Sequence, residues 1–310
     1  MRITAVGEIL VDMTETSVDE RGIKHFAANP GGAPANVAVA AAKLGAETAF
    51  IGCVGDDVFG TMLRDTLVQN GVDVSGLQVS ETAGTTLAVV TVDAKGERSF
   101  SFCRKPGADT RMDGAKAAAA AAGTGIIHFG SVSLTDPDSR RATVTAVKAA
   151  KKAGAIVSYD PNYRASLWAD RETAVREMRA PLSLCDIVKI SDEETALLTG
   201  AQDPKEAARI LCEGGAKLVL VTLGAKGALW RCGGESGVVP GCPVKVADTN
   251  GAGDTFFGAL LSRIALRGGL GNLNAQEITG IVAYANRAAA LTTSRPGAIP
   301  AMPTRSELEG

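Results

Sequence analysis

The sequence predicts an α/β fold in which a central, mostly parallel sheet is flanked by helices on both faces. Three observations support this prediction. Short apolar runs rich in β-branched residues alternate with helix-like runs from one end of the chain to the other. These short runs are apolar at nearly every position, as strands buried on both faces are. One later stretch has instead the pattern of an antiparallel hairpin.

The expected strands and helices follow one another along the chain. The strands are predicted at Ile3–Val11, Thr48–Val54, Ile126–Gly130, Ile156–Tyr159, Ile187–Ile190 and Leu218–Thr222. The helices are predicted at Pro34–Leu44, Phe59–Asn70, Ser139–Ala153, Lys205–Glu213, Gly253–Arg267 and Ala275–Leu291. Several of these helices are followed by glycine, which often ends a helix. This alternation is typical of a parallel sheet covered on both faces.

Two segments interrupt the alternation, at about residues 13–29 and 85–104. The first is polar and has no helical period. In the second, Thr86–Val92 and Glu97–Cys103 flank Asp93-Ala94-Lys95-Gly96, a pattern typical of a β-hairpin. We expect both segments to form a small β-sheet lid, inserted in one domain that spans all 310 residues. The alternative for the hairpin is an ordinary edge hairpin.

The composition excludes several functional classes. The chain has 310 residues, of which 45% are hydrophobic, and a formal net charge of −2. Because no excess of Lys and Arg is available to neutralise phosphates, nucleic acid is not expected as a partner. The apolar runs are far shorter than the ~20 residues that cross a bilayer, so no membrane partner is expected. The N-terminus has no signal-peptide pattern, and we expect a cytoplasmic protein.

Cysteine and histidine usage gives no sign of a metal centre. The six cysteines are widely spaced without a C-x-x-C motif, and the chain has two histidines. A Cys/His zinc site is therefore not expected, and the cysteines are expected to be reduced. The P-loop, dinucleotide-binding, hydrolase and zinc-protease motifs are also absent from the sequence.

The strongest local motif is Asp248-Thr249-Asn250-Gly251-Ala252-Gly253-Asp254, which precedes an apolar helix. Small residues at a helix start leave backbone N–H groups accessible, and together with the helix dipole these groups form an anion site. Gly251, Ala252 and Gly253 therefore predict a phosphate cradle. Asp254 would either interact favourably with the helix dipole or accept a proton from a hydroxyl nucleophile.

A second glycine-rich segment, Gly31-Gly32-Ala33-Pro34-Ala35-Asn36, also begins a helix. Pro34 suits the first helical position, and the two glycines permit unusual backbone torsions. Asn36 is expected in the first helical turn, where it can hold a polar ligand. Asp12 ends the first predicted strand, and ligands of open α/β sheets bind beyond the carboxyl ends of strands. This position places Asp12 where a sugar hydroxyl could be bound.

Two arginines are further candidates for binding. Arg164 follows the predicted strand Ile156–Tyr159, and Arg104 follows the predicted hairpin. Each could contact the substrate or a phosphate. The alternative for each is a surface ion pair with an acidic neighbour.

Together these motifs resemble the signatures of the ribokinase-like carbohydrate kinases, also called the phosphofructokinase B family. Gly31–Gly55 resembles the N-terminal signature and Asp248–Asp254 the C-terminal one. Four further segments lie in the same order and are most similar to fructokinases. They are GDDVFG at 55–60, SYDPNYRASLW at 158–168, KISDEETALLTG at 189–200 and TLGAKG at 222–227. The resemblance covers essentially the whole chain.

This resemblance implies a three-layer ribokinase-like fold with a small β-sheet lid. It also implies a phosphotransferase that moves the γ-phosphoryl group of ATP to a sugar hydroxyl, with Mg²⁺ and a potassium-type ion. D-fructose, phosphorylated at O6, is the favoured substrate. The nearest rival is 2-keto-3-deoxygluconate, because Arg104 and Arg164 could bind its carboxylate. A ribokinase or a nucleoside kinase is a further alternative.

A non-catalytic sugar- or nucleotide-binding protein on the same fold is the alternative from another class. Asp254 argues against it, because a protein that only binds does not need a base beside an anion site.

The resemblance also implies roles for individual residues. Asp254 matches the catalytic base, and the amides of Gly251, Ala252 and Gly253 match the anion hole. Sugar-binding roles are expected for Asp12, Gly31, Gly32, Asn36, Arg104, Arg164 and Asp254. Nucleotide-side roles are expected for Lys189, Ser191, Glu194, Thr222, Gly224, Gly227, Gly253 and Asn286. Glu194 matches a residue that organises Mg²⁺-bound water, and Asp248 and Asn250 match a monovalent cation site.

The sequence departs from the family pattern at Ser191, where many relatives carry Asn. An amide contact is therefore not expected at this position. Asp192 and Glu193 are also acidic, so the acidic role is open among these two residues and Glu194.

The predicted lid hairpin carries more apolar residues, such as Val89 and Phe102, than a solvated flap requires. Pairing with the lid of a second copy would cover the exposed strand edges. We therefore expect a homodimer.

Overall fold

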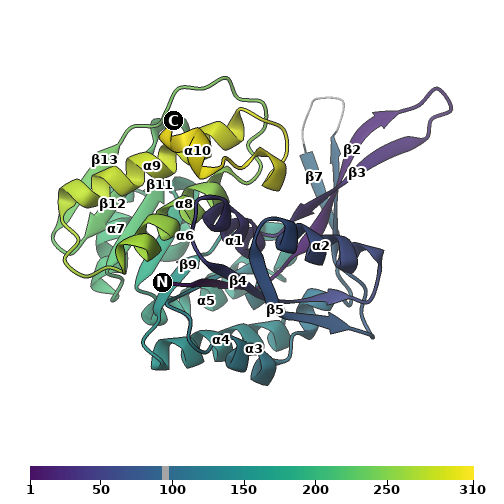
Figure 1. Cartoon of the computed structure of the whole chain (residues 1–310), viewed down its shortest axis with the longest axis horizontal. Coiled ribbons are helices and arrows are strands. Elements are labelled where there is room, and N and C mark those ends of the chain that lie inside the picture. The colour runs from purple at the N-terminus through teal and green to yellow at the C-terminus, as the bar shows by residue number, and fades with distance from the viewer. Residues whose placement is uncertain (93–97) are drawn as a thin grey trace.

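A nine-stranded sheet forms the centre of the molecule in the computed structural model, which describes residues 1–92 and 98–310. Its strands are β1 (Ile3–Val6), β4 (Thr48–Gly55), β5 (Val72–Ser80), β8 (Ile126–Gly130), β9 (Ile156–Asp160), β10 (Ile187–Ser191), β11 (Leu218–Thr222), β12 (Ala228–Cys232) and β13 (Glu235–Val239). They lie in the order β13-β12-β11-β10-β9-β8-β1-β4-β5 (Figure 1). Strands β11 to β5 of this order pair in parallel, and β12 and β13 extend the edge in antiparallel.

Helices cover both faces of this sheet. One face carries α1 (Ala33–Lys43), α2 (Val58–Gln69), α8 (Ala252–Arg267) and α9 (Ala275–Thr293), with the short α10 (Arg305–Glu309) beside α9. The other carries α3 (Gly114–Ala120), α4 (Pro137–Lys152), α5 (Arg171–Arg179), α6 (Thr195–Thr199) and α7 (Pro204–Glu213). Because side chains alternate along a strand, Ile3 and Ala5 of β1 face the first layer and Val6 faces the second. The predicted three-layer α/β fold is confirmed.

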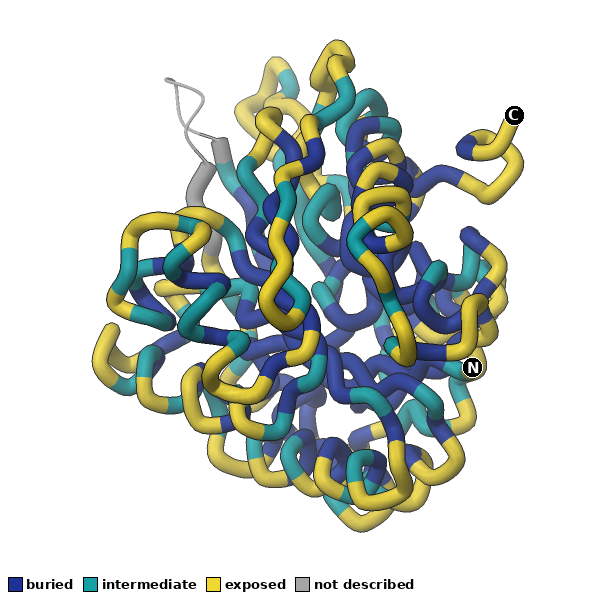
Figure 2. The backbone as a smooth tube through the Cα atoms, turned by 90° about the vertical axis from the view of Figure 1, so that its left-hand side faces the viewer, coloured by how far each residue is buried: buried dark blue, intermediate teal, exposed yellow. Residues whose placement is uncertain are grey.

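Burial follows these layers. In Figure 2 the central strands are dark blue, and the outer surfaces of the helices are yellow. Within the described residues, no helix is long and apolar enough to cross a bilayer.

The N-terminal strand differs from the prediction. A single strand over Ile3–Val11 is wrong, because β1 ends at Val6 and a new strand, β2 (Leu10–Val18), begins in a second sheet. Gly7 makes the break with a φ of 148°, a torsion that glycine adopts readily. The hydropathy pattern hides this break, because Glu8 between the two strands is as buried as its apolar neighbours. Asp12 therefore lies in the second sheet and does not end a strand of the main one.

The second sheet contains four strands, in the order β3-β2-β6-β7. Strands β3 (Lys24–Gly31), β6 (Leu87–Val92) and β7 (Arg98–Cys103) join β2 in it. Strand β2 pairs antiparallel with β3 and parallel with β6, and β6 pairs antiparallel with β7. In Figure 1 this sheet extends from the body at the upper right. The predicted hairpin turn, Asp93-Ala94-Lys95-Gly96, lies outside the described residues.

A close crossing of α1 and α8 brings the starts of these helices together. A β-carbon at Gly258 would lie 2.6 Å from the Ala40 Cβ and 2.7 Å from the Val37 carbonyl oxygen. Only glycine on α8 allows the two backbones to approach this closely. Pro34 at the start of α1 also packs against Gly7, directly after β1. The glycine motifs that begin the two helices therefore meet at the carboxyl end of β1.

We expect Gly258→Val to push α1 and α8 apart. Overpacking of this kind costs about 1–3 kcal/mol, so thermal unfolding should show a clearly lowered Tm. The matched control is Gly280→Val on α9, because a β-carbon at Gly280 would meet no atom within 4 Å. An unchanged Tm in Gly258→Val would contradict the close packing of α1 against α8 at this position.

Candidate active site

The DTNGAGD motif forms the loop that begins α8. Gly251 precedes the helix with a φ of 72°, a left-handed conformation that glycine adopts without strain. The Ala252 N–H turns back to the Thr249 carbonyl at 3.4 Å. The N–H groups of Gly253 and Asp254 follow in the first turn, where a helix provides no acceptor of its own. The helix start can therefore hold an anion.

Asp254 lies in this first turn and is held by two amide side chains. Its Oδ2 accepts a hydrogen bond of 2.8 Å from Asn36 Nδ2 at the start of α1. Its Oδ1 accepts a longer one of 3.5 Å from Asn162 Nδ2 in the loop after β9. Asn162 has a φ of 46°, a left-handed conformation that Asn tolerates better than most residues. Donors from two separate segments therefore fix the orientation of the carboxylate.

The surroundings of Asp254 strengthen it as a base. Burial raises the pKa of this carboxyl, and the Asn36 hydrogen bond and the charges of Lys189 and Arg164 oppose the rise. The net shift is upward. A carboxylate with a raised pKa holds a transferred proton better than an exposed aspartate does.

A buried cation lies beside the anion site. Lys189 on β10 forms an ion pair of 2.7 Å with Asp160 at the end of β9. A β-carbon at Gly253 would lie 3.1 Å from the Lys189 Nζ, which places the ammonium next to the helix start. Burial lowers the pKa of Lys189, but nearby carboxylates, Asp160 first among them, outweigh it and leave the pKa raised. The ammonium therefore stays charged and can help to hold a phosphate.

Asp12 approaches from the second sheet. A β-carbon at Gly31 would meet the Asp12 carboxylate, which therefore lies directly against the end of strand β3. Burial raises the pKa of Asp12 to about 6, while Arg164 lowers it and Asp254 raises it. Arg164 is exposed and donates to the Tyr163 carbonyl at 3.2 Å. The structure thus brings Asp12, Arg164 and Asp254 within electrostatic reach of one another.

Glu194 connects two segments of the site through hydrogen bonds. Its Oε2 accepts from the Ser191 N–H at 2.8 Å and from the Ser191 Oγ at 3.1 Å. Its Oε1 accepts from the Tyr163 N–H at 2.7 Å, next to Asn162. Glu194 is buried, whereas Asp192 and Glu193 are exposed. One lone pair of Oε1 remains, which suits contact with a Mg²⁺-bound water rather than direct coordination.

Four of the expected nucleotide-side residues lie toward the β13 edge of the sheet. Thr222 ends β11 and donates to the Ile190 carbonyl at 3.3 Å, and Gly224 and Gly227 bound the turn to β12. A β-carbon at Gly227 would collide with the Val239 carbonyl. Asn286 on α9 donates to the Val239 and Pro240 carbonyls at 3.1 and 3.0 Å. Its amide nitrogen therefore anchors the segment after β13 beside this turn.

The expected cation residues join two loops. The Asp248 carboxylate accepts from the Asn250 N–H at 3.1 Å and from the Gly297 N–H at 3.0 Å. A β-carbon at Gly251 would lie 2.9 Å from the Ala298 Cβ, so the loops are in contact. Carboxylate and carbonyl oxygens at such a junction are the ligands that a hard cation prefers. The residues present therefore fit a monovalent cation.

Three contributors to the site were not predicted from the sequence. Asn162 and Asp160 lie in the segment SYDPNYRASLW, and their position directly after an apolar strand was a usable signal. Glu8 is 2% exposed, and its Oε1 accepts from the Ala33 N–H at 3.2 Å. This hydrogen bond stabilises the start of α1, directly after Gly31 and Gly32. Neither hydropathy nor a family motif marked it, because an isolated Glu in an apolar run carries no pattern.

Comparisons with known proteins show what the whole chain is similar to. The sequence matches the pfkB family carbohydrate kinases over residues 2–305. It is 40% identical over 317 residues to a protein named probable fructokinase-4 from Arabidopsis thaliana, covering 99% of this chain and 95% of that protein. A fructokinase with bound ATP from Xylella fastidiosa has a TM-score of 0.88 and 37% identity, covering 99% of this chain and 96% of that one.

A second solved structure is similar to the same extent. It is a fructokinase double mutant from Vibrio cholerae O395 bound to fructose, ADP and potassium ion. Its TM-score is 0.89 at 36% identity, covering 99% of this chain and 96% of that chain.

We expect Asn36→Ala to shift the pH dependence of the reaction. Loss of the amide donor removes an interaction that lowers the pKa of Asp254, so this pKa should rise further. Because a base acts in its deprotonated form, the acid limb of the kcat/KM profile should move to higher pH. An acid limb at the wild-type position would contradict the role of Asp254 as the titrating base.

We expect Glu8→Gln to change how stability depends on pH. Burial raises the pKa of Glu8 from an ordinary 4.5 to about 8. The folded state therefore binds this proton more tightly, so stability is lost as pH rises from about 4.5 through about 8. Denaturant unfolding should show a variant that gains up to a few kcal/mol over wild type at about pH 9 and nothing at about pH 4.

Glu47→Gln is the matched control, because the Glu47 side chain is exposed. It should follow the wild-type curve. A constant difference between Glu8→Gln and wild type at all pH values would contradict the raised pKa of Glu8.

Proposed function

Because the chain belongs to the pfkB family of carbohydrate kinases, we propose that it transfers the γ-phosphoryl group of ATP to O6 of D-fructose. The products are fructose 6-phosphate and ADP. The observation that carries this proposal is the buried Asp254 carboxylate at the start of α8, held by Asn36 and flanked by Lys189. The relatives named fructokinase support the choice of sugar.

The site residues divide the work of phosphoryl transfer. Asp254 accepts the proton of the attacking hydroxyl, and Asn36 and Asn162 keep its oxygens in place. The amides of Gly251, Ala252 and Gly253 and the Lys189 ammonium stabilise the negative charge of the moving group, and the Ala252 N–H leaves its 3.4 Å contact with the Thr249 carbonyl to do so. Such transfer depends on positioning and charge stabilisation more than on covalent chemistry by the protein.

The sugar is held by residues of the second sheet and of the segment before α1. Asp12 binds hydroxyl groups from the second sheet, with Gly31 and Gly32 giving the sugar close access to the backbone. Arg164 lies where it can contact the sugar or a phosphate. The second sheet, with the segments about 13–29 and 85–104, acts as the lid of a single domain spanning residues 1–310.

The nucleotide and its ions occupy the other half of the site. Thr222, Gly224 and Gly227 line the nucleotide side, and Asn286 holds the neighbouring segment in place. Mg²⁺ would be held mainly by the ATP phosphates and its waters, and Glu194, near Lys189 and Ser191, would hold one of those waters.

A potassium ion binds beside the anion hole. The Asp248 carboxylate and the Asn250 carbonyl supply its ligands, and the ion adds positive charge next to the start of α8. The potassium ion bound by the fructokinase of Vibrio cholerae O395 supports this assignment.

The location and assembly of the enzyme follow from its chemistry and surface. ATP as a substrate and six free cysteine thiols favour the cytoplasm. Strand β3 is an edge of the second sheet, and Val18, Ile23 and Phe26 on the β2–β3 hairpin are 54, 49 and 37% exposed. Covering these side chains with the lid of a second copy gives a homodimer.

Asp254→Asn tests the catalytic proposal. Loss of the base should lower kcat by about 10²–10⁴-fold, whereas ATP affinity should stay within a few-fold because the asparagine keeps the size of the side chain. Steady-state kinetics and calorimetric ATP titration measure the two effects. The matched control is Asp203→Asn at the exposed start of α7, which should keep the wild-type kcat. Turnover that survives in Asp254→Asn would refute the base assignment.

Phe26→Asp combined with Ile23→Asp tests the dimer. Wild type should scatter light with twice the mass of one chain at micromolar concentration, and the variant with the mass of one. Val238→Asp is the control, because Val238 is 53% exposed and its strand β13 is an edge of the nine-stranded sheet, not of the lid. A monomeric wild type would rule the dimer out.

A further inference from the structure

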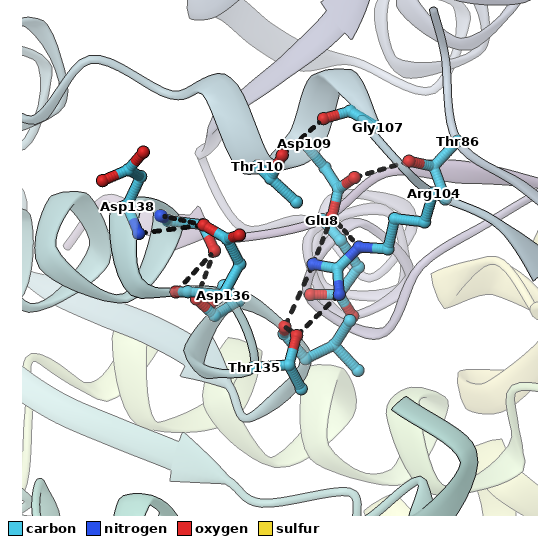
Figure 3. Close-up of polar contacts among 12 residues, drawn as sticks. Glu8, Thr86, Arg104, Gly107, Asp109, Thr110, Thr135, Asp136 and Asp138 are labelled. Carbon is cyan, nitrogen blue, oxygen red and sulfur yellow. Dashed lines mark hydrogen bonds and ion pairs between the residues drawn. The ribbon is translucent and has the colours of Figure 1, made fainter. Parts of the chain in front are cut away.

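A second buried polar cluster lies at the foot of the lid (Figure 3). Its members come from segments far apart in sequence that meet near the end of β1. They are Glu8 after β1, Thr86 before β6, Arg104 after β7, Asp109 in the turn 108–111, and Thr135 after β8. Arg104 was expected to contact the substrate, and its surroundings here indicate a different role.

Arg104 is enclosed by acceptors from the protein itself. Its side chain is 8% exposed and forms an ion pair of 2.6 Å with Asp109. The Nε donates to the same Asp109 oxygen at 2.8 Å, Nη1 donates to Thr135 Oγ1 at 2.6 Å, and Nη2 donates to the Val132 carbonyl at 3.1 Å. Figure 3 shows the guanidinium group between Asp109 and Thr135, with Glu8 beside it.

These contacts occupy the N–H edges of the guanidinium group through which an arginine binds a carboxylate. A guanidinium group has five N–H donors, and a carboxylate binds best to two that are parallel. The Nε and Nη2 pair is taken by Asp109, and the second Nη2 hydrogen is taken by Val132. The four contacts leave one N–H of Nη1, which can serve a single hydroxyl but not a bidentate carboxylate.

Asp109 itself is firmly held in this position. Its carboxylate is 1% exposed, and its Oδ1 accepts a hydrogen bond of 2.5 Å from Thr86 Oγ1. Burial raises the pKa of the neighbouring Glu8 to about 8, so that Glu8 is mostly protonated near neutral pH. The cluster therefore carries one positive and one negative charge that cancel.

The cluster borders the expected sugar site. Glu8 accepts from the Ala33 N–H, directly after the Gly31-Gly32 pair, and Arg104 lies within electrostatic reach of Glu8. The lid strands connect it to Asp12, since Asp12 pairs with Ala88 on β6 and Ala88 pairs with Phe102 on β7, two residues before Arg104. Through Glu8, Arg104 therefore lies next to the segment that follows Gly31-Gly32, where the sugar is expected.

We infer that Asp109 determines substrate charge specificity: by occupying Arg104, it reserves the pocket for a neutral sugar and excludes sugar acids. The inference rests on the proposed function, because it concerns the sugar of the same site. A sugar acid such as 2-keto-3-deoxygluconate would bring a carboxylate to a site whose buried cations Arg104 and Lys189 are already paired with Asp109 and Asp160. The charge of the nearby Arg164 is exposed and therefore screened by solvent. An ionised carboxylate that loses water without gaining a partner binds poorly.

Asp109→Asn is the direct test. The variant keeps the size of the side chain and removes its charge, so that the Nε and Nη2 hydrogens of Arg104 are no longer held in an ion pair and become available to a carboxylate. We expect kcat/KM for 2-keto-3-deoxygluconate relative to D-fructose to rise about tenfold or more. The inhibition constant of the acid against fructose should fall in parallel, and this constant remains measurable if the acid is bound without turnover.

The double variant Asp109→Asn with Arg104→Gln shows whether the gain passes through Arg104. We expect the double variant to lose the gained affinity for the acid. The matched control is Asp138→Asn, an exposed aspartate on α4 that pairs with Arg141 (Figure 3 shows Asp138 apart from the Arg104 contacts). It should keep the wild-type preference, and its Tm and that of Asp109→Asn show whether each variant is folded.

The outcomes separate the inference from the proposed function. A wild type that phosphorylates no fructose refutes the proposed function, whatever Asp109 does. A wild type that uses fructose, together with an Asp109→Asn variant that stays folded and binds the acid no better, refutes the inference alone. A gain that persists without Arg104 also refutes it, because the pocket would then have changed in another way.

Discussion

The meeting of two helix starts is the constraint on which the site depends. Helices α1 and α8 cross closely at Gly258, and their first turns then place Asn36 against Asp254 at 2.8 Å. Each helix begins with a glycine-rich segment, so backbone N–H groups and a hydrogen-bonded carboxylate lie at one point. A phosphoryl group needs the donors and an attacking hydroxyl needs the base, and the crossing supplies both.

Buried charges organise the remainder of the site around this point. Lys189 stands beside the helix start and is balanced by Asp160, while Glu194 ties the end of β10 to the loop that carries Asn162. Removal of one member would leave an uncompensated charge in a region of low dielectric constant. The same logic holds at the foot of the lid, where Arg104 and Asp109 neutralise each other.

Much of the fold was predictable, because buried parallel strands have a simple apolar pattern. The strands predicted from Ile126 to Thr222 and the two helices predicted between them, Ser139–Ala153 and Lys205–Glu213, are confirmed within a residue or two, whereas α5 and α6 were not predicted. The family resemblance is also confirmed. The break at Gly7 was missed because Glu8 pairs through tertiary contacts. The sequence could place Asp254 at a helix start, but the partners of Arg104 depend on how four separate segments meet.

The most direct test of the account is a phosphorus NMR measurement of the products formed from ATP and D-fructose with Mg²⁺ and K⁺. We predict that fructose 6-phosphate and ADP appear in equal amounts, and that Asp254→Asn gives neither at a comparable rate. Release of inorganic phosphate without a sugar phosphate, or ATP that stays intact beside fructose, would contradict the proposed transfer.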